Sequence, residues 1–141
     1  MTKKVVLIFV LLCAAAPYSN AQDKFSVSGE VVYSGTESIY VCLHTQETLE
    51  NFTKKLPPQA FVQMVKATSS GRATFKLVDI PKGDYVLLVF IDKNNNGKFD
   101  CDSLGMPTEP FLMYKNFRLI VNWSGQRFTV DKDVTGIELD F

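Results

Sequence analysis

Alternation of apolar and polar side chains with a period of two is the feature that most constrains this chain. It runs through four segments, whose apolar members are Phe25, Val27, Val31 and Tyr33; Ile39, Val41 and Leu43; Ala73, Phe75 and Leu77; and Ile137, Leu139 and Phe141. Successive side chains of a β-strand point to opposite faces, so each segment is expected to be a strand with one buried face. The pattern excludes a mainly helical fold.

Residues 85–91 read Tyr-Val-Leu-Leu-Val-Phe-Ile and are apolar on both faces, as expected for a central strand covered on both sides. Turn signals at residues 57–58, 69–71 and 81–83 separate short strands. We therefore predict an all-β fold, an antiparallel two-sheet sandwich of the transthyretin-like or immunoglobulin-like kind with seven or eight strands.

One short helix is expected at residues 45–56. Leu49, Phe52 and Leu56 are spaced three and four apart, and Thr45 can cap the first turn.

The first 21 residues have the pattern of a signal peptide. Lys3 and Lys4 precede an apolar run at residues 5–16, and small residues follow at positions 19–21. The run is shorter than the 18 or more residues of a membrane-spanning helix. Lipidation of Cys13 is the weaker alternative, because Leu12 stands where a small residue is needed. We predict cleavage before Gln22, a single domain at residues 22–141, no transmembrane segment in the mature chain, and a location in the periplasm or at the cell surface.

Removal of residues 1–21 takes away two lysines and no acid, which leaves 13 basic and 15 acidic residues. A chain without a basic excess has no field to hold a polyanion, so nucleic acid is not expected as a partner. The mature chain keeps Cys42 and Cys101. In an oxidising compartment two cysteines can form a disulfide, and the alternative is two unpaired, partly buried thiols.

The segment 92–100 carries the strongest chemical signal. Oxygen-bearing side chains recur at every second residue, and a glycine follows the third of them. Calcium takes six to eight oxygen ligands, so a loop that wraps it presents alternate side chains, turns sharply at a glycine and adds a main-chain carbonyl. The expected calcium ligands are the side chains of Asp92, Asn94, Asn96 and Asp100 and the carbonyl of Lys98.

The match to a calcium loop ends at the twelfth position, where Ser103 replaces the usual glutamate. Asp102 or Glu109 could close the shell only if the chain folds back. We therefore expect weak binding, on the order of 10⁻⁴ to 10⁻³ M. The alternative is a bare hairpin turn at Asn96-Gly97, since both residues tolerate positive φ.

Three motifs in series resemble the DUF2141 family of exported bacterial proteins. They are Pro-Lys-Gly-Asp-Tyr at residues 81–85, the Asp-x-Asn-x-Asn-Gly-x-x-Asp loop at 92–100, and Leu-Gly-Met-Pro-Thr-Glu at 104–109. The resemblance implies a sandwich fold and a segment 104–109 that folds against the loop and brings Glu109 to it. The chain departs from the family pattern at Ile91, where a histidine is usual, and at residues 111–116.

No convincing catalytic group emerges. His44, the single histidine, shares a strand face with Cys42 and is expected at the surface, without the third group that nucleophilic catalysis needs. We expect a non-catalytic binding or accessory module of the cell envelope that holds one Ca²⁺ and meets an envelope protein or a glycan. The alternatives are a small glycan hydrolase that uses Asp100 and Glu109, and a purely structural envelope protein.

Overall fold

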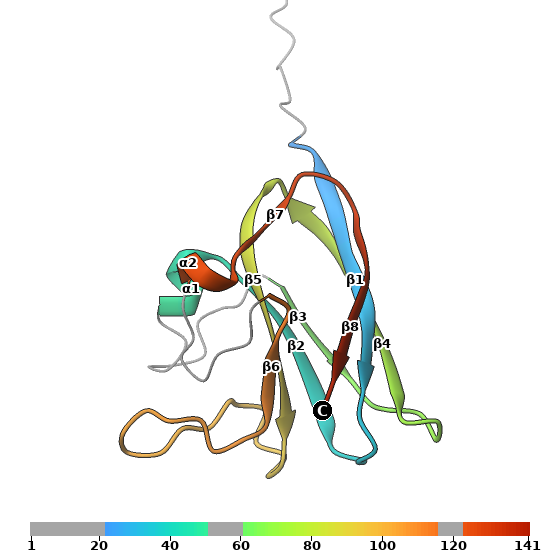
Figure 1. Cartoon of the computed structure of the whole chain (residues 1–141), viewed down its shortest axis with the longest axis vertical. Helices are drawn as coiled ribbons and strands as arrows, with labels where there is room; N and C mark the ends of the chain where they lie inside the picture. The colour runs from blue at the N-terminus through green and yellow to red at the C-terminus, as the bar shows by residue number, and fades with distance from the viewer. Residues whose placement is uncertain (1–21, 51–60, 116–122) are drawn as a thin grey trace, which may run out of the picture.

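The computed structural model describes residues 22–50, 61–115 and 123–141, which form two β-sheets of three and five strands. Figure 1 shows the two sheets facing each other. The strands are β1 (Lys24–Val32), β2 (Ser38–His44), β3 (Phe61–Val65), β4 (Arg72–Pro81), β5 (Gly83–Asp92), β6 (Phe111–Met113), β7 (Phe128–Val130) and β8 (Val134–Asp140). The predicted sandwich-like, mostly β fold is confirmed.

The strand order is β4-β1-β8 in the small sheet and β3-β2-β5-β6 in the large one, where β7 also pairs with β5. One pair departs from the antiparallel expectation, because β8 runs parallel to β1. β7 lies beside the start of β5, with Val130 opposite Gly83, and the chain then crosses to the small sheet at the end where β1 begins. β8 must therefore run in the same direction as β1.

β5 is the central strand, and both of its faces are buried. Its inward side chains, Leu87, Val89 and Ile91, belong to the main core between the sheets. Its outward side chains, Val86, Leu88 and Phe90, belong to a second core. The second core is covered by Leu49, Met113, Phe99 and Trp123 from the surrounding segments. The prediction of a central strand covered on both sides is confirmed.

Two very short helices lie on the outer side of the large sheet (Figure 1). α1 (Gln46–Glu50) begins where Thr45 accepts a hydrogen bond at Oγ1 from the backbone N–H of Thr48, at 3.3 Å. Thr45 is thus the predicted cap, while Phe52 and Leu56 lie outside the described residues. α2 (Trp123–Gln126) was not predicted. No described helix has the length and apolar character needed to cross a membrane.

The Pro-x-Gly-x-Tyr motif carries the chain from one sheet to the other. β4 ends at Pro81 in the small sheet and β5 begins at Gly83 in the large one. The hydroxyl of Tyr85 donates a hydrogen bond to the carbonyl of Pro81 at 2.9 Å. This bond fixes the sharp change of direction between the two strands.

The outer face of β2 differs from the sequence-based expectation in one respect. His44 is 1% exposed, whereas a surface histidine was expected. Burial lowers the pKa of its imidazole to about 4. The expectation was wrong because a second core covers this face of the sheet. Cys42 is buried on the same face. Cys42 and Cys101 are both free thiols, so the structure has the unpaired cysteines and not the disulfide.

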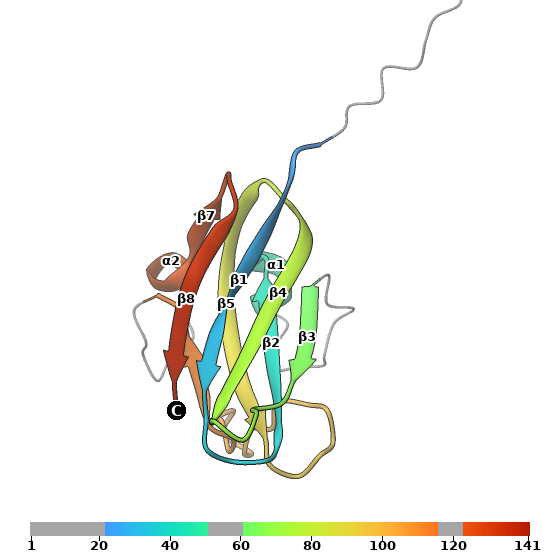
Figure 2. The ribbon, with the colours of Figure 1, turned by 90° about the vertical axis from the view of Figure 1, so that its right-hand side faces the viewer.

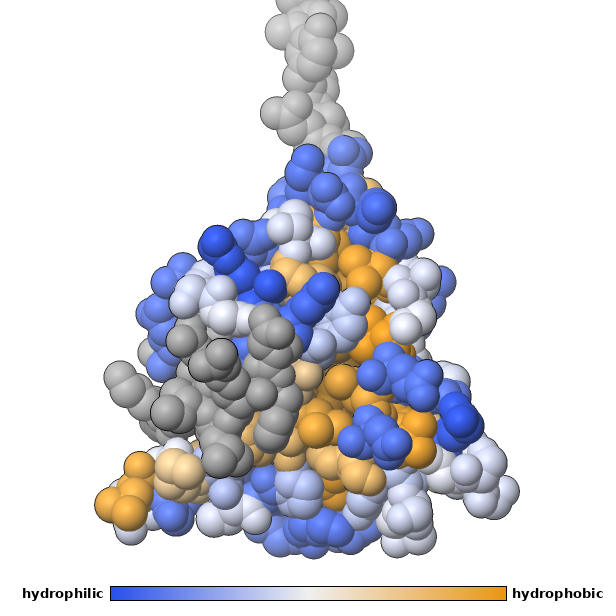
Figure 3. Space-filling model, in the orientation of Figure 1, coloured by the Kyte–Doolittle hydropathy of each residue, from blue (hydrophilic) through white to orange (hydrophobic). Residues whose placement is uncertain are grey.

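Several connections meet at the end of the sandwich opposite the start of β1. They are the β1–β2 turn at residues 33–37, the β3–β4 turn at residues 66–71 and the long β5–β6 loop at residues 93–110 (Figures 1 and 2). The C-terminus lies near the same end. In Figure 3 apolar side chains show at the tip of the β5–β6 loop, where Leu104 is 86% exposed. Loops held on a rigid sandwich are where binding residues usually lie.

Candidate functional site: the β5–β6 loop

The loop is anchored by Asp92, the last residue of the central strand. Its side chain is 1% exposed, although a carboxylate is costly to bury without partners. Oδ1 accepts a hydrogen bond from the N–H of Asn96 at 3.2 Å, and Oδ2 accepts one from the N–H of Gly97 at 2.8 Å. These two hydrogen bonds fold the following five residues back over the end of β5.

Three of the predicted ligands meet at one point. The side-chain amides of Asn94 and Asn96 both donate to Oδ2 of Asp100, at 2.7 and 2.6 Å. Their Oδ1 atoms accept backbone N–H groups two residues ahead, from Asn96 at 3.1 Å and Lys98 at 2.8 Å. The alternate-residue series thus brings two amides and one carboxylate together.

The backbone in this loop is not the two-residue hairpin that the alternative required. A type I′ turn at Asn96-Gly97 needs positive φ at both residues. The left-handed residues are instead Asn95, with φ of 58°, and Gly97, with φ of 70°. Since Asp92 binds the N–H groups of residues 96 and 97, the chain is wrapped around a carboxylate, with Gly97 at the sharp bend.

Glu109 folds back onto the loop, as the family resemblance implied. Its Oε1 accepts a hydrogen bond from the N–H of Lys93 at 2.9 Å, and its Oε2 accepts one from the N–H of Asp100 at 3.2 Å. The side chain is 6% exposed. Burial raises the pKa of this carboxyl, the nearby charges of Asp100 and Asp92 raise it further, and the two backbone N–H groups act in the opposite direction.

A small hairpin between Asp100 and Thr108 carries the chain back to Glu109. The N–H of Thr108 donates to the carbonyl of Asp100 at 2.9 Å. Asp102 is occupied within this hairpin, because its Oδ1 accepts the N–H groups of Leu104 and Met106 at 2.8 and 2.9 Å. Of the two acids considered for closing the shell, Glu109 therefore reaches the loop and Asp102 does not.

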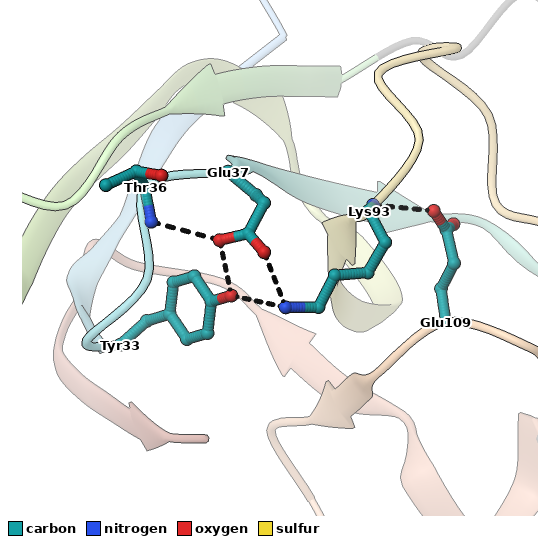
Figure 4. Close-up of polar contacts among 5 residues, drawn as sticks. All are labelled: Tyr33, Thr36, Glu37, Lys93 and Glu109. Atoms are coloured by element: carbon teal, nitrogen blue, oxygen red, sulfur yellow. Dashed lines mark hydrogen bonds and ion pairs between the residues drawn. The ribbon is translucent and has the colours of Figure 1, made fainter.

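Lys93 joins the loop to the β1–β2 turn, a contact that no motif or periodicity in the sequence predicts. Its Nζ donates hydrogen bonds of 2.7 Å to the hydroxyl of Tyr33 and to Oε1 of Glu37, and it also lies over the Tyr33 ring (Figure 4). Tyr33 donates in turn to Oε2 of Glu37 at 2.7 Å. Hydrogen bonds from Lys93 and then Tyr33 lower the pKa of Glu37 to about 2. Only the three-dimensional fold brings these two turns together.

The oxygen atoms in this loop are the hard donors that calcium or magnesium accepts, whereas a transition metal usually binds imidazole or thiolate. The described residues contain no group of three or more His, Cys, Asp or Glu side chains positioned to hold a metal. Any cation here would therefore depend on the two amides as well as on carboxylates. The main-chain carbonyl of Lys98 stays a predicted ligand.

For proton-transfer chemistry, a raised pKa at Glu109 is a property of general acids. Both oxygens of Glu109 nevertheless face backbone N–H groups of the loop, and Oδ2 of Asp100 faces two amides. In this arrangement both carboxylates are occupied by hydrogen bonds that hold the loop in shape.

A comparison with protein families matches residues 27–138 to DUF2141, a family described as an uncharacterized protein conserved in bacteria. Neither the curated proteins nor the solved structures include a match. The matched range contains the central strand, the whole β5–β6 loop and most of both sheets. The chain therefore belongs to the DUF2141 family.

Proposed function

We propose that this protein is an exported, non-catalytic binding or accessory module of the cell envelope, and that its β5–β6 loop binds one structural Ca²⁺. The observation that carries the calcium site is the meeting of the Asn94, Asn96 and Asp100 side chains at one oxygen. Buried carboxylates of Asp92 and Glu109 flank them. Asp92, Asn94, Asn96 and Asp100 occupy the first, third, fifth and ninth positions of a calcium loop. Glu109 stands in place of the twelfth.

The charge balance of the loop favours a cation. Burial and neighbouring negative charges both raise the pKa of Glu109, so its ionised form lacks a positive partner. Lys93, whose backbone N–H binds Glu109, directs its ammonium group away to Glu37. A divalent ion beside Asp100 would supply the missing charge.

Binding has a cost that sets the expected affinity. The two amides point their N–H groups at Asp100, so each must rotate about Cβ–Cγ to present Oδ1 to an ion. Rotation gives up both bonds to Asp100 and the backbone bonds accepted by the Oδ1 atoms. We therefore expect weak affinity, on the order of 10⁻⁴ to 10⁻³ M, within the range of extracellular calcium modules.

Thermal unfolding tests the calcium site, because an ion that binds only the folded loop stabilises the fold. Calcium at about one hundred times its dissociation constant should add about 2.7 kcal/mol and raise Tm by several degrees. Magnesium should do less, since it demands tighter octahedral geometry. Asp100→Asn should lose most of the response, while Asp131→Asn, at the opposite end of the sandwich, should keep it.

An unchanged Tm of the wild type at calcium concentrations of one hundred times the expected dissociation constant, on the order of 10 to 100 mM, would contradict the site. The loop would then be a carboxylate-organised turn without a metal.

Export is a separate part of the proposal, and residues 1–21 lie outside the described residues. Mass spectrometry of the protein purified from its own cells should find an N-terminus near Gln22. A chain that retains Met1 in the cytoplasm would contradict it.

A further inference from the structure

A hollow of about 390 Å³ lies between the β1–β2 turn and the β3–β4 turn. Residues 34–36 form one wall and residues 67–71 form the other. Figure 2 shows the two turns side by side at the loop-rich end of the sandwich. The N–H of Tyr33 donates to the carbonyl of Gly71 at 2.8 Å, which ties the two walls together. The volume suits a small-molecule ligand.

The lining contains no charged side chain, and its side-chain polar groups are all hydroxyls. Thr68 and Ser70 share a hydrogen bond of 2.8 Å between their hydroxyl oxygens. The hydroxyls of Ser34, Thr36 and Ser69 belong to exposed residues and make no hydrogen bond to another described residue. Each hydroxyl can donate one hydrogen bond and accept others, as each hydroxyl of a sugar can.

The wall at Gly35 is backed by the side chains of Tyr33 and Glu37. A Cβ at this position would lie 2.2 Å from the Tyr33 hydroxyl and 2.4 Å from Oε2 of Glu37, so a larger residue here would displace these two side chains. Glu37 also accepts the N–H of Thr36 at 3.0 Å and the ammonium of Lys93 at 2.7 Å (Figure 4). The wall is therefore formed before any ligand arrives, which lowers the entropy that binding would cost.

We infer that this hollow binds a neutral sugar unit. The exposed hydroxyls on the two walls match a ligand whose own groups are hydroxyls, and the uncharged lining disfavours an ionic ligand. The nearby charges of Lys93 and Glu37 are already paired with each other. The site is open, and all five hydroxyl-bearing residues of its walls are exposed, so we expect millimolar affinity for one sugar unit.

The inference goes beyond the proposed function and does not need the cation. The sugar experiment is run with a chelator present, whereas the calcium experiment follows Tm. Failure of either one leaves the other interpretable.

The test is a titration of the isotope-labelled mature chain, followed by amide resonances, with the neutral disaccharides maltose, cellobiose and N,N′-diacetylchitobiose. At least one should shift amides of residues 34–36 and 67–71 and saturate at millimolar concentration. Ser34→Ala with Ser69→Ala should weaken this binding at least fivefold. Thr135→Ala removes an exposed hydroxyl on β8, outside the hollow, and should leave it unchanged.

Three outcomes would overturn the inference. One is the absence of saturable shifts at these turns with all three sugars. Another is equal binding by wild type and the double alanine variant, provided that both give folded spectra. The third is tighter binding of glucose 6-phosphate than of any neutral disaccharide, which would assign the hollow to an anion.

Discussion

Glu37 and Glu109 lie on either side of Lys93, and their pKa values shift in opposite directions. Glu37 receives the ammonium of Lys93 and the hydroxyl of Tyr33, and its pKa falls to about 2. Glu109 receives only the backbone N–H groups of Lys93 and Asp100, and burial raises its pKa. Lys93 thus binds Glu37 through its charged side chain and Glu109 through its backbone N–H.

At this end of the molecule the Lys93 ammonium group pairs with Glu37 and leaves Glu109 with backbone N–H groups alone. Hydrogen bonds from neutral N–H groups position a carboxylate, but here they do not offset its burial and the neighbouring acids. In the β1–β2 turn the charge of Glu37 is already balanced by the Lys93 ammonium group. Glu109 has no ammonium partner in the described part of the chain, and burial and the neighbouring acids raise its pKa, which is the physical reason to look for a divalent ion there.

The largest effect is expected from Asp92→Ala, which tests whether a buried carboxylate organises the loop. It leaves the N–H groups of Asn96 and Gly97 without their acceptor and should cost roughly 3 kcal/mol of unfolding free energy. Urea denaturation measures the loss. Asp102→Ala also removes an acceptor of two N–H groups, but at an exposed site, and should cost much less. Equal losses would show that burial of Asp92 contributes little.

The next effect comes from His44 and must be separated from that of Glu109. The folded protein resists protonation of His44 down to about pH 4, while an unfolded chain accepts the proton near pH 6.5. Folding stability should therefore fall as the pH drops from about 6.5 to about 4, by roughly 3 kcal/mol at most. His44→Gln should flatten this part of the curve of unfolding free energy against pH. An unchanged slope in the variant would assign the acid lability elsewhere.

Glu109 should give the opposite slope in a calcium-free solution. Because its folded pKa lies above the ordinary value of 4.5, the unfolded chain ionises first. In the His44→Gln background, stability should decline as the pH rises from 4.5 through the raised pKa. Calcium should reverse that decline, and its effect on Tm should shrink in acid. A calcium effect on Tm that is independent of pH would separate Glu109 from the ion.

The smallest effect is expected from Lys93→Met, which removes the cation from Glu37 and keeps the backbone N–H of residue 93 for Glu109. The Glu37 pKa should return from about 2 toward its ordinary value of 4.5, as a side-chain NMR titration can follow. The unfolding free energy at neutral pH should change little, because an exposed ion pair is screened by solvent. A matching change in the pKa of Glu109 would show that the two carboxylates are not independent.

The strands that the sequence predicted best are those with one buried face, such as β1 and β4, and the wholly apolar β5. Three others were not predicted. β3 carries apolar residues on both sides without being central, and β6 and β7 are three residues long, too short for a periodic pattern. The parallel pairing of β8 with β1 could not be predicted either, because it depends on where the chain crosses between sheets.

For the candidate site, alternation predicted the loop members from Asp92 to Asp100, since local geometry decides them. The return of Glu109 came from the family resemblance, because a hairpin of its own brings that residue back. The contacts of Lys93 with Tyr33 and Glu37 join turns more than fifty residues apart and follow only from the packed sheets. His44 was placed wrongly for a related reason, since periodicity does not show what covers a sheet.

The pairing of β1 with β8 also sets the order of events in folding. Val27 pairs with Val134 and Val31 with Leu139, so the small sheet joins segments more than one hundred residues apart. Contacts of such sequence separation slow folding, because a long chain segment must be closed before they form. β1 has no second neighbour until β8 has been synthesised. The sandwich is therefore expected to close only after its last strand has left the ribosome, with kinetics in the slow range typical of all-β domains.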